Sequence, residues 1–148
     1  MPKKTIEQQQ SAQRVGILGE TIVQAFLLGV ADFCYQTQFG HPADLIVEFG
    51  NNSLYKVQVK TRNLGAKGKY SFPIEHHRKI SETHKHYHID LFAFVFLPSR
   101  NILFKANTST QKYFIFNKKV IQEGMEIESL QTALEQLSSI PIISNLLD

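Results

Sequence analysis

The chain of 148 residues is long enough for one domain that buries its own core, and its 43% hydrophobic and 20% charged residues are ordinary for a globular protein. A single cysteine, Cys34, excludes an intrachain disulfide and with it a disulfide-stabilised extracellular scaffold. The N-terminus is polar and no apolar run approaches the roughly 18 residues of a membrane span, so we expect a cytoplasmic protein.

Basic residues are concentrated in the middle of the chain. Residues 56–119 contain thirteen Lys or Arg residues and three acidic residues. Residues 1–55 contain three basic and five acidic residues, and residues 120–148 contain five acidic residues and no Lys or Arg. This distribution indicates a surface that binds a polyanion, and a solvated lysine-rich face is the alternative explanation.

The first predicted element is a helix over residues 6–28, which Gly29 is expected to end. Apolar residues recur in it at helical spacing, namely Val15, Leu18, Ile22, Val23 and Phe26. Gly16 and Gly19 lie inside the helix, where each glycine costs about 1 kcal/mol relative to alanine. The two glycines therefore predict close approach of a neighbouring element or of a nucleic-acid strand.

Three strands are predicted next, over residues 33–37, 43–49 and 54–61, and the last two form a hairpin. Both arms of the hairpin carry apolar residues at odd positions: Leu45, Val47 and Phe49, then Tyr55, Val57 and Val59. Because side chains alternate between the faces of a sheet, burying both sets together brings Asp44, Gln58 and Lys60 to the opposite face.

The register of this hairpin is predicted from its charged residues. Pairing Asp44 with Lys60 and Glu48 with Lys56 gives two favourable cross-strand pairs around a three-residue loop at 51–53.

The remaining elements predict an α/β or α+β layer structure in a single domain over residues 1–148. They are a basic glycine-rich loop over 61–70, a short helix over 81–88, a buried strand over 89–97, a turn over 98–101, strands over 102–106 and 112–119, and a helix over 127–138 that Pro141 ends. The last helix has an apolar stripe of Ile127, Leu130, Leu134 and Leu137. This stripe, with the apolar tail over 140–147, predicts core packing or an oligomer interface.

The polar residues of the hairpin suit phosphodiester hydrolysis. Asp44 and the Gln58 amide supply hard oxygen ligands, which with the backbone carbonyl of Val59 form a candidate Mg²⁺ site. Lys60 is expected to orient or deprotonate the attacking water, or to neutralise the transition state. Glu20 adds a ligand, directly or through water, if the first helix faces the site. A simple cross-strand ion pair, worth about 0.2–1 kcal/mol, is the alternative.

These residues resemble the core of the PD-(D/E)xK nuclease superfamily. The segments that carry the resemblance are GILGE (16–20), ADLIV (43–47), YKVQVKT (55–61) and DLFAFV (90–95), within about residues 11–97. It implies a restriction-endonuclease-like mixed β-sheet of order αβββαβ with C-terminal strand and helix additions. It also implies Glu20, Asp44, Gln58 and Lys60 as the catalytic set, with Mg²⁺ or Mn²⁺ as cofactor. Gln58 replaces the Glu or Asp of most members, which lowers the negative charge available to a metal.

The Gln-x-Lys motif of this chain resembles the variant motif found in a small intron-encoded homing endonuclease, which this chain also resembles in size. That resemblance implies site-specific cleavage of double-stranded DNA by a homo-oligomer, a dimer or a dimer of dimers. Archaeal Holliday junction resolvases share the Gly-x-x-x-Glu, Asp and acid-x-Lys arrangement and provide the alternative, ahead of a restriction or repair nuclease. A non-catalytic DNA-binding module with a decayed site is the other alternative.

Basic residues and two tyrosines outside the catalytic set are the candidate DNA contacts. They are Arg62, Lys67, Lys69, Tyr70, Arg78, Lys79, Lys85, Lys112, Tyr113, Lys118 and Lys119. Five histidines lie between His76 and His88, and we expect them at a surface that meets phosphates or base edges, or simply in solvent, rather than in a zinc site.

Overall fold

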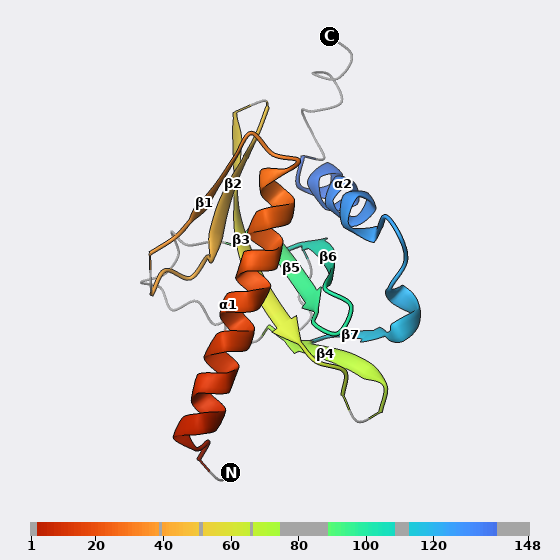
Figure 1. Ribbon diagram of the computed structural model, residues 1–148. Helices are drawn as coiled ribbons and strands as arrows, with labels where there is room; N and C mark the ends of the chain where they lie inside the picture. Colours follow the sequence, from red (N-terminus) through yellow and green to blue (C-terminus); the bar gives the residue numbers. More distant parts are fainter. Residues whose placement is uncertain are drawn as a thin grey trace.

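The computed structural model describes residues 3–38, 40–50, 52–65, 67–74, 89–108 and 113–138 (Figure 1). In order, these residues form α1 (Ile6–Leu28), β1 (Phe33–Gln36), β2 (Leu45–Phe49), β3 (Ser53–Arg62), β4 (Lys69–Pro73), β5 (Leu91–Phe96), β6 (Asn101–Ala106), β7 (Tyr113–Asn117), the short 3-10 helix η3 (Lys118–Val120) and α2 (Met125–Leu137).

A five-stranded mixed sheet lies at the centre, in the order β1-β2-β3-β5-β6. Strands β3 and β5 run parallel, and the other neighbours are antiparallel. Helices α1 and α2 share a core with one face of the sheet, while β4 and β7 form a separate antiparallel pair that packs on the other face (Figure 1). The predicted α+β class is therefore confirmed.

Helix α1 has the bounds that its sequence predicts. Thr5 caps its first turn through a reciprocal pair of hydrogen bonds with Gln8, which satisfies backbone donors that the helix itself leaves free. Val23 and Leu27 are fully buried against the sheet, whereas residues 3–14 are exposed. Gly29 ends the helix as expected, but with a φ of −83°, so its position does not require a glycine.

The hairpin confirms the predicted faces and corrects the predicted register. Leu45, Val47, Val57 and Val59 are all buried in the core beneath α1. However, Leu45 pairs with Val57 and Glu48 pairs with Leu54, so the pairings of Asp44 with Lys60 and of Glu48 with Lys56 are wrong. The register is shifted by two residues, which preserves the faces, and Phe49 pairs with Ser53 across residues 50–52. Asn52 adopts the left-handed conformation with a φ of 62°, as this short turn requires.

The segment after the hairpin also differs from its prediction as one loop. Thr61 and Arg62 belong to β3, and Lys69 and Tyr70 begin β4, which pairs with β7. Tyr70, Phe72 and Phe114 form an aromatic core with the even-numbered phenylalanines of β5. The basic glycine-rich composition of residues 61–70 obscured the alternation of Tyr70, Phe72 and Ile74, which is a strand pattern.

The remaining described elements agree with the predictions. Strand β5 is buried along its whole length, and α2 buries Leu130 while Leu134 and Leu137 pack against the same core. Ile127 is 43% exposed and is not part of that core. Among the described helices, none has the length and hydropathy that crossing a bilayer requires. The predicted helix over 81–88, the histidines from His76 to His88 and the tail after residue 138 lie outside the described residues.

Candidate active site

The candidate site lies where β2 and β3 separate. The ladder between them stops after Leu45 and Val57, and the amide of Asp44 then donates to the carbonyl of Val57 at 2.9 Å. Beyond this point the Asp44 side chain replaces the missing strand partner, because its Oδ2 accepts from the amide of Val59 at 2.8 Å. Continuing the register by one residue places Gln58 opposite Asp44. The site therefore opens at a defined break in the sheet.

A short loop holds the backbone of Asp44 in place. The Thr37 amide donates to the Asp44 carbonyl at 3.1 Å, and its hydroxyl donates to the Ala43 and Asp44 carbonyls at 2.5 and 3.0 Å. Nδ1 of His41 lies 3.0 Å from the amide nitrogen of Ala43 and 3.2 Å from its carbonyl oxygen. These contacts fix the direction in which the Asp44 carboxylate points.

Helix α1 brings Glu20 to Asp44, and the two carboxyl groups form a hydrogen bond. Burial raises the pKa of Glu20, and the charge of Asp44 and the hydrogen bond to it raise this pKa further. Burial also raises the pKa of Asp44, although the Val59 amide, the charge of Lys60, the Glu20 hydrogen bond and the charge of His41 oppose the rise. Two carboxyl groups in contact thus retain a proton more readily than isolated ones.

Gly19 determines how closely α1 can approach β3. A Cβ on Gly19 would lie 1.7 Å from Oγ1 of Thr61, so only glycine allows this separation. This contact confirms that Gly19 serves close packing on a neighbouring element. Glu20 follows Gly19 directly, and the same contact therefore determines how far the Glu20 carboxyl group reaches over the sheet.

Gln58 and Lys60 extend the site along β3. Gln58 is only 8% exposed, and its Oε1 is buried without a hydrogen-bond partner among the described residues. A buried, unpaired amide oxygen is unfavourable by about 1–3 kcal/mol, so a ligand that donates to Gln58 Oε1 or coordinates it would be stabilised there. Burial lowers the pKa of Lys60; the nearby charge of Asp44 opposes this effect and that of Arg62 adds to it.

These groups fit a divalent cation that prefers oxygen ligands. Among the described residues, no three His, Cys, Asp or Glu side chains are grouped closely enough to hold a metal by themselves. Two carboxylates in contact, and the amide oxygen of the residue opposite Asp44, are hard oxygen donors of the kind that Mg²⁺ takes while keeping several waters. A cation here would also offset the burial that raises both carboxyl pKa values and the charge of Asp44 that raises the pKa of Glu20 further.

The fold itself is that of known nucleases. A bacterial homing endonuclease, I-Ssp6803I, superposes with a TM-score of 0.57 at 14% identity, over 84% of this chain and 95% of its own. A Holliday junction resolvase from Archaeoglobus fulgidus, Hjc, superposes with a TM-score of 0.52 at 17% identity, over 80% of this chain and 94% of its own. No protein-family model matches the chain, and no curated protein matches it by sequence. The predicted restriction-endonuclease-like fold is confirmed.

On this restriction-endonuclease-like frame, several of the predicted DNA contacts lie at the surface. Arg62, Lys67, Lys69, Lys118 and Lys119 are exposed, and Tyr113 is 52% exposed. The assignment of Tyr70 is wrong, because it is 3% exposed and its ring packs edge-on against Phe96 in the core. Arg78, Lys79, Lys85 and Lys112 lie outside the described residues.

His41 is the site residue that the sequence did not reveal. It lines a cleft together with Glu20 and Asp44, and its charge acts on Asp44. It stands three positions before Asp44 and apart from the other five histidines of the chain. Its position three residues before the predicted catalytic aspartate is the feature of the sequence that could have indicated its place in the site.

Proposed function

We propose that this protein is a divalent-cation-dependent DNA endonuclease in which Glu20, Asp44, Gln58 and Lys60 form the active site. One observation carries the proposal. Two hydrogen-bonded carboxyl groups with raised pKa values lie near the partly buried Lys60, and the strand register sets Gln58, whose amide oxygen is buried and unpaired among the described residues, opposite Asp44. Such perturbed groups cluster where charge is handled during catalysis.

In the proposed mechanism Glu20, Asp44 and the Gln58 amide oxygen would hold Mg²⁺ or Mn²⁺, together with the backbone carbonyl of Val59. When bound, the cation supplies Lewis acidity and positive charge at the scissile phosphate. The Val59 amide keeps the Asp44 carboxylate oriented, since it donates to Oδ2 at 2.8 Å. A bound cation would hold Glu20 in its deprotonated form, with the proton released to solvent.

Lys60 acts on the phosphate from the same strand. Its side chain is partly buried, so its interaction with an anion is screened less than that of a surface lysine. We assign to it the stabilisation of negative charge that develops on the phosphate oxygens. Because burial lowers its pKa, Lys60 also releases a proton to a neighbouring base more readily than an exposed lysine does.

The substrate we favour is double-stranded DNA cut at a specific site, as in homing endonucleases, and a Holliday junction is the second candidate. The first is supported by the Gln58-x-Lys60 motif and by the likeness to the bacterial homing endonuclease. The likeness to the archaeal resolvase supports the second. Cutting both strands of a symmetric duplex requires two active sites, so we propose a homo-oligomer in either case. Arg62, Lys67, Lys69, Tyr113, Lys118 and Lys119 are its proposed DNA contacts.

Plasmid cleavage tests the proposal. Supercoiled plasmid incubated with the protein and Mg²⁺ is expected to be nicked and linearised, and EDTA is expected to stop the reaction. Lys60→Met should lower the rate by about 100- to 1000-fold. Lys105→Met is the matched control, because Lys105 is exposed on β6 and lies outside the site, and it should cleave at the wild-type rate.

Two further results separate the alternatives. A wild-type protein that binds DNA in a salt-dependent manner but never cleaves it would identify a non-catalytic binding module instead. A four-way junction compared with its linear duplex arms distinguishes the two enzymatic candidates. Symmetric nicking of the junction, whatever its sequence, with no cutting of linear DNA would favour the resolvase.

A further inference from the structure

Gly16 is a glycine inside α1 that the fold does not need. Unlike a Cβ on Gly19, a Cβ built on Gly16 meets no described atom within 4 Å outside its own helix. Its backbone is helical, with no positive φ that would favour glycine. A glycine at such a position destabilises the helix by about 1 kcal/mol relative to alanine and gains no packing in return.

Two clefts meet at this glycine. One lies between α1 and the loop before β2, and Glu20, His41 and Asp44 line it together with Gly16. The other lies between α1 and β3, and Lys60 and Arg62 line it together with Gly16. The clefts have volumes of about 580 and 560 Å³. Gly16 therefore forms the boundary between a cleft with the carboxylates and a cleft with the cations.

We propose that the sugar-phosphate backbone of the scissile DNA strand crosses α1 at Gly16, passing from the cationic cleft to the carboxylate cleft. This inference rests on the proposed nuclease function. Phosphates on one side of the crossing meet Arg62, and the scissile phosphate lies at the crossing, where Lys60 faces it from one cleft and Glu20 and Asp44 face it from the other. A side chain at position 16 would stand in this path.

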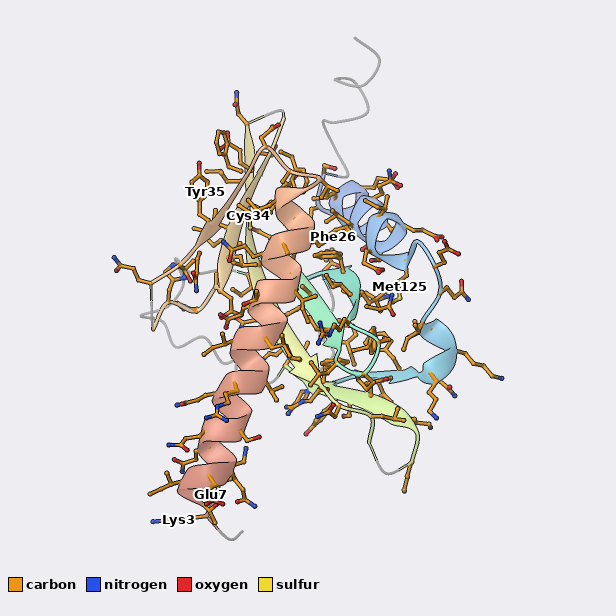
Figure 2. All side chains as sticks on the ribbon, viewed as in Figure 1. Lys3, Glu7, Phe26, Cys34, Tyr35 and Met125 are labelled. Atoms are coloured by element: carbon orange, nitrogen blue, oxygen red, sulfur yellow. The ribbon has the colours of Figure 1, made fainter. Side chains whose placement is uncertain are left out.

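The exposed N-terminal half of α1 is suited to the same strand. Residues 3–14 are all exposed and contain three basic residues and four glutamines, with Glu7 as their single acidic residue. Lys3 and Glu7 lie at the far tip of this projecting segment, beyond the strands (Figure 2). Lysine, arginine and glutamine side chains are common donors to phosphate oxygens, so a strand crossing at Gly16 would continue along this segment.

Side chains introduced at position 16 test the path. Gly16→Ala and Gly16→Leu should fold with thermal stability equal to or above that of the wild type, because both are better helix formers. Affinity for a fluorescein-labelled linear duplex, measured with Ca²⁺ in place of Mg²⁺, should fall by about tenfold or more for Gly16→Leu and by less for Gly16→Ala. Plasmid cleavage should fall in the same order. Ala25→Leu, an exposed position of α1 outside both clefts, should behave as the wild type.

The outcomes separate the crossing from the nuclease function. If the wild type cleaves plasmid and Gly16→Leu binds and cleaves equally well, the crossing is refuted and the nuclease function stands. If Gly16→Leu fails to fold, the space at position 16 is not open and the crossing is again refuted. A wild type that neither binds nor cleaves DNA would overturn both proposals. A wild type that binds without cleaving, with weaker binding by Gly16→Leu, would overturn the nuclease function and support only the path of a DNA backbone across Gly16.

Discussion

Replacing Asp44 by asparagine and by alanine separates the hydrogen bonding of this side chain from its charge. Both variants remove the carboxylate and should abolish cleavage. They differ in the amide of Val59, which donates to Asp44 Oδ2 at 2.8 Å in a nearly buried part of β3. Asparagine keeps an oxygen acceptor there and adds an N–H donor for Glu20, whereas alanine leaves the Val59 amide without its partner.

The expected difference in stability follows from this contact. A buried N–H that loses its acceptor destabilises the fold by about 1–3 kcal/mol, so Asp44→Ala should be less stable than Asp44→Asn by that amount. The charge effect cancels between the two, because both remove the same carboxylate. Against the wild type, Asp44→Asn should be equally or more stable near neutral pH, since the repulsion with Glu20 is gone.

Urea denaturation monitored by far-UV circular dichroism measures these differences, because the chain contains no tryptophan for fluorescence. Mg²⁺ provides the second arm of the assay. At a concentration of 100 times its dissociation constant, a ligand that binds only the folded state stabilises it by about 2.7 kcal/mol, and this gain should be largely lost in both variants. Equal stabilities of the two variants, or undiminished stabilisation of Asp44→Asn by Mg²⁺, would refute the assigned role of Asp44.

Three more perturbations have outcomes that the structure specifies. Gly19→Ala should destabilise the protein by about 1–3 kcal/mol despite its better helix propensity, because its Cβ would collide with Thr61. In a double-mutant cycle, Thr61→Gly should reduce that loss. Additive effects of the two substitutions would contradict the contact. Because the pKa of Glu20 is raised in the folded protein, the free energy of unfolding without metal should fall as the pH rises from 4.5 through that pKa. Urea titrations over this pH range should show a smaller fall for Glu20→Gln. A pH profile of Glu20→Gln equal to that of the wild type would contradict the pairing of Glu20 with Asp44. Arg62→Ala should weaken DNA binding about equally for all sequences and reduce the slope of log affinity against log salt concentration by about 1. Lys105→Ala, at another exposed position, is the control. A slope for Arg62→Ala like that of the wild type would exclude a phosphate contact by Arg62.

The hairpin shows which structural features its sequence could predict and which it could not. Side chains alternate along a strand for local steric reasons, so the inward face of β2 and β3 was predictable: Leu45, Val47, Val57 and Val59 are buried, and Phe49 and Tyr55 are partly buried. The register was not predictable in the same way, because a shift by two residues leaves every side chain on its face. The turn at 50–52 and the break at Asp44 determine it, and cross-strand charge pairs of less than about 1 kcal/mol were too weak to do so.

Tyr70 shows the opposite failure. Its basic and glycine-rich neighbours suggested an exposed loop that contacts DNA, yet its ring lies in the aromatic core beneath β5. That burial depends on β7, whose nearest residue in sequence lies more than forty positions away. Composition describes a segment and its immediate neighbours, and it carries no information on which distant strand will pair with it.

The sequence by itself determined the types of residue available for chemistry, the periodicity of the helix and strands, and the side of the sheet on which Gln58 and Lys60 project. These follow from interactions within a few residues along the chain. Only the tertiary structure decided that Glu20 meets Asp44, that Gln58 Oε1 is left unpaired, and that two clefts join at Gly16. Each of these depends on where α1 crosses the sheet, and that crossing is set by packing between segments some forty residues apart, at the contact of Gly19 with Thr61.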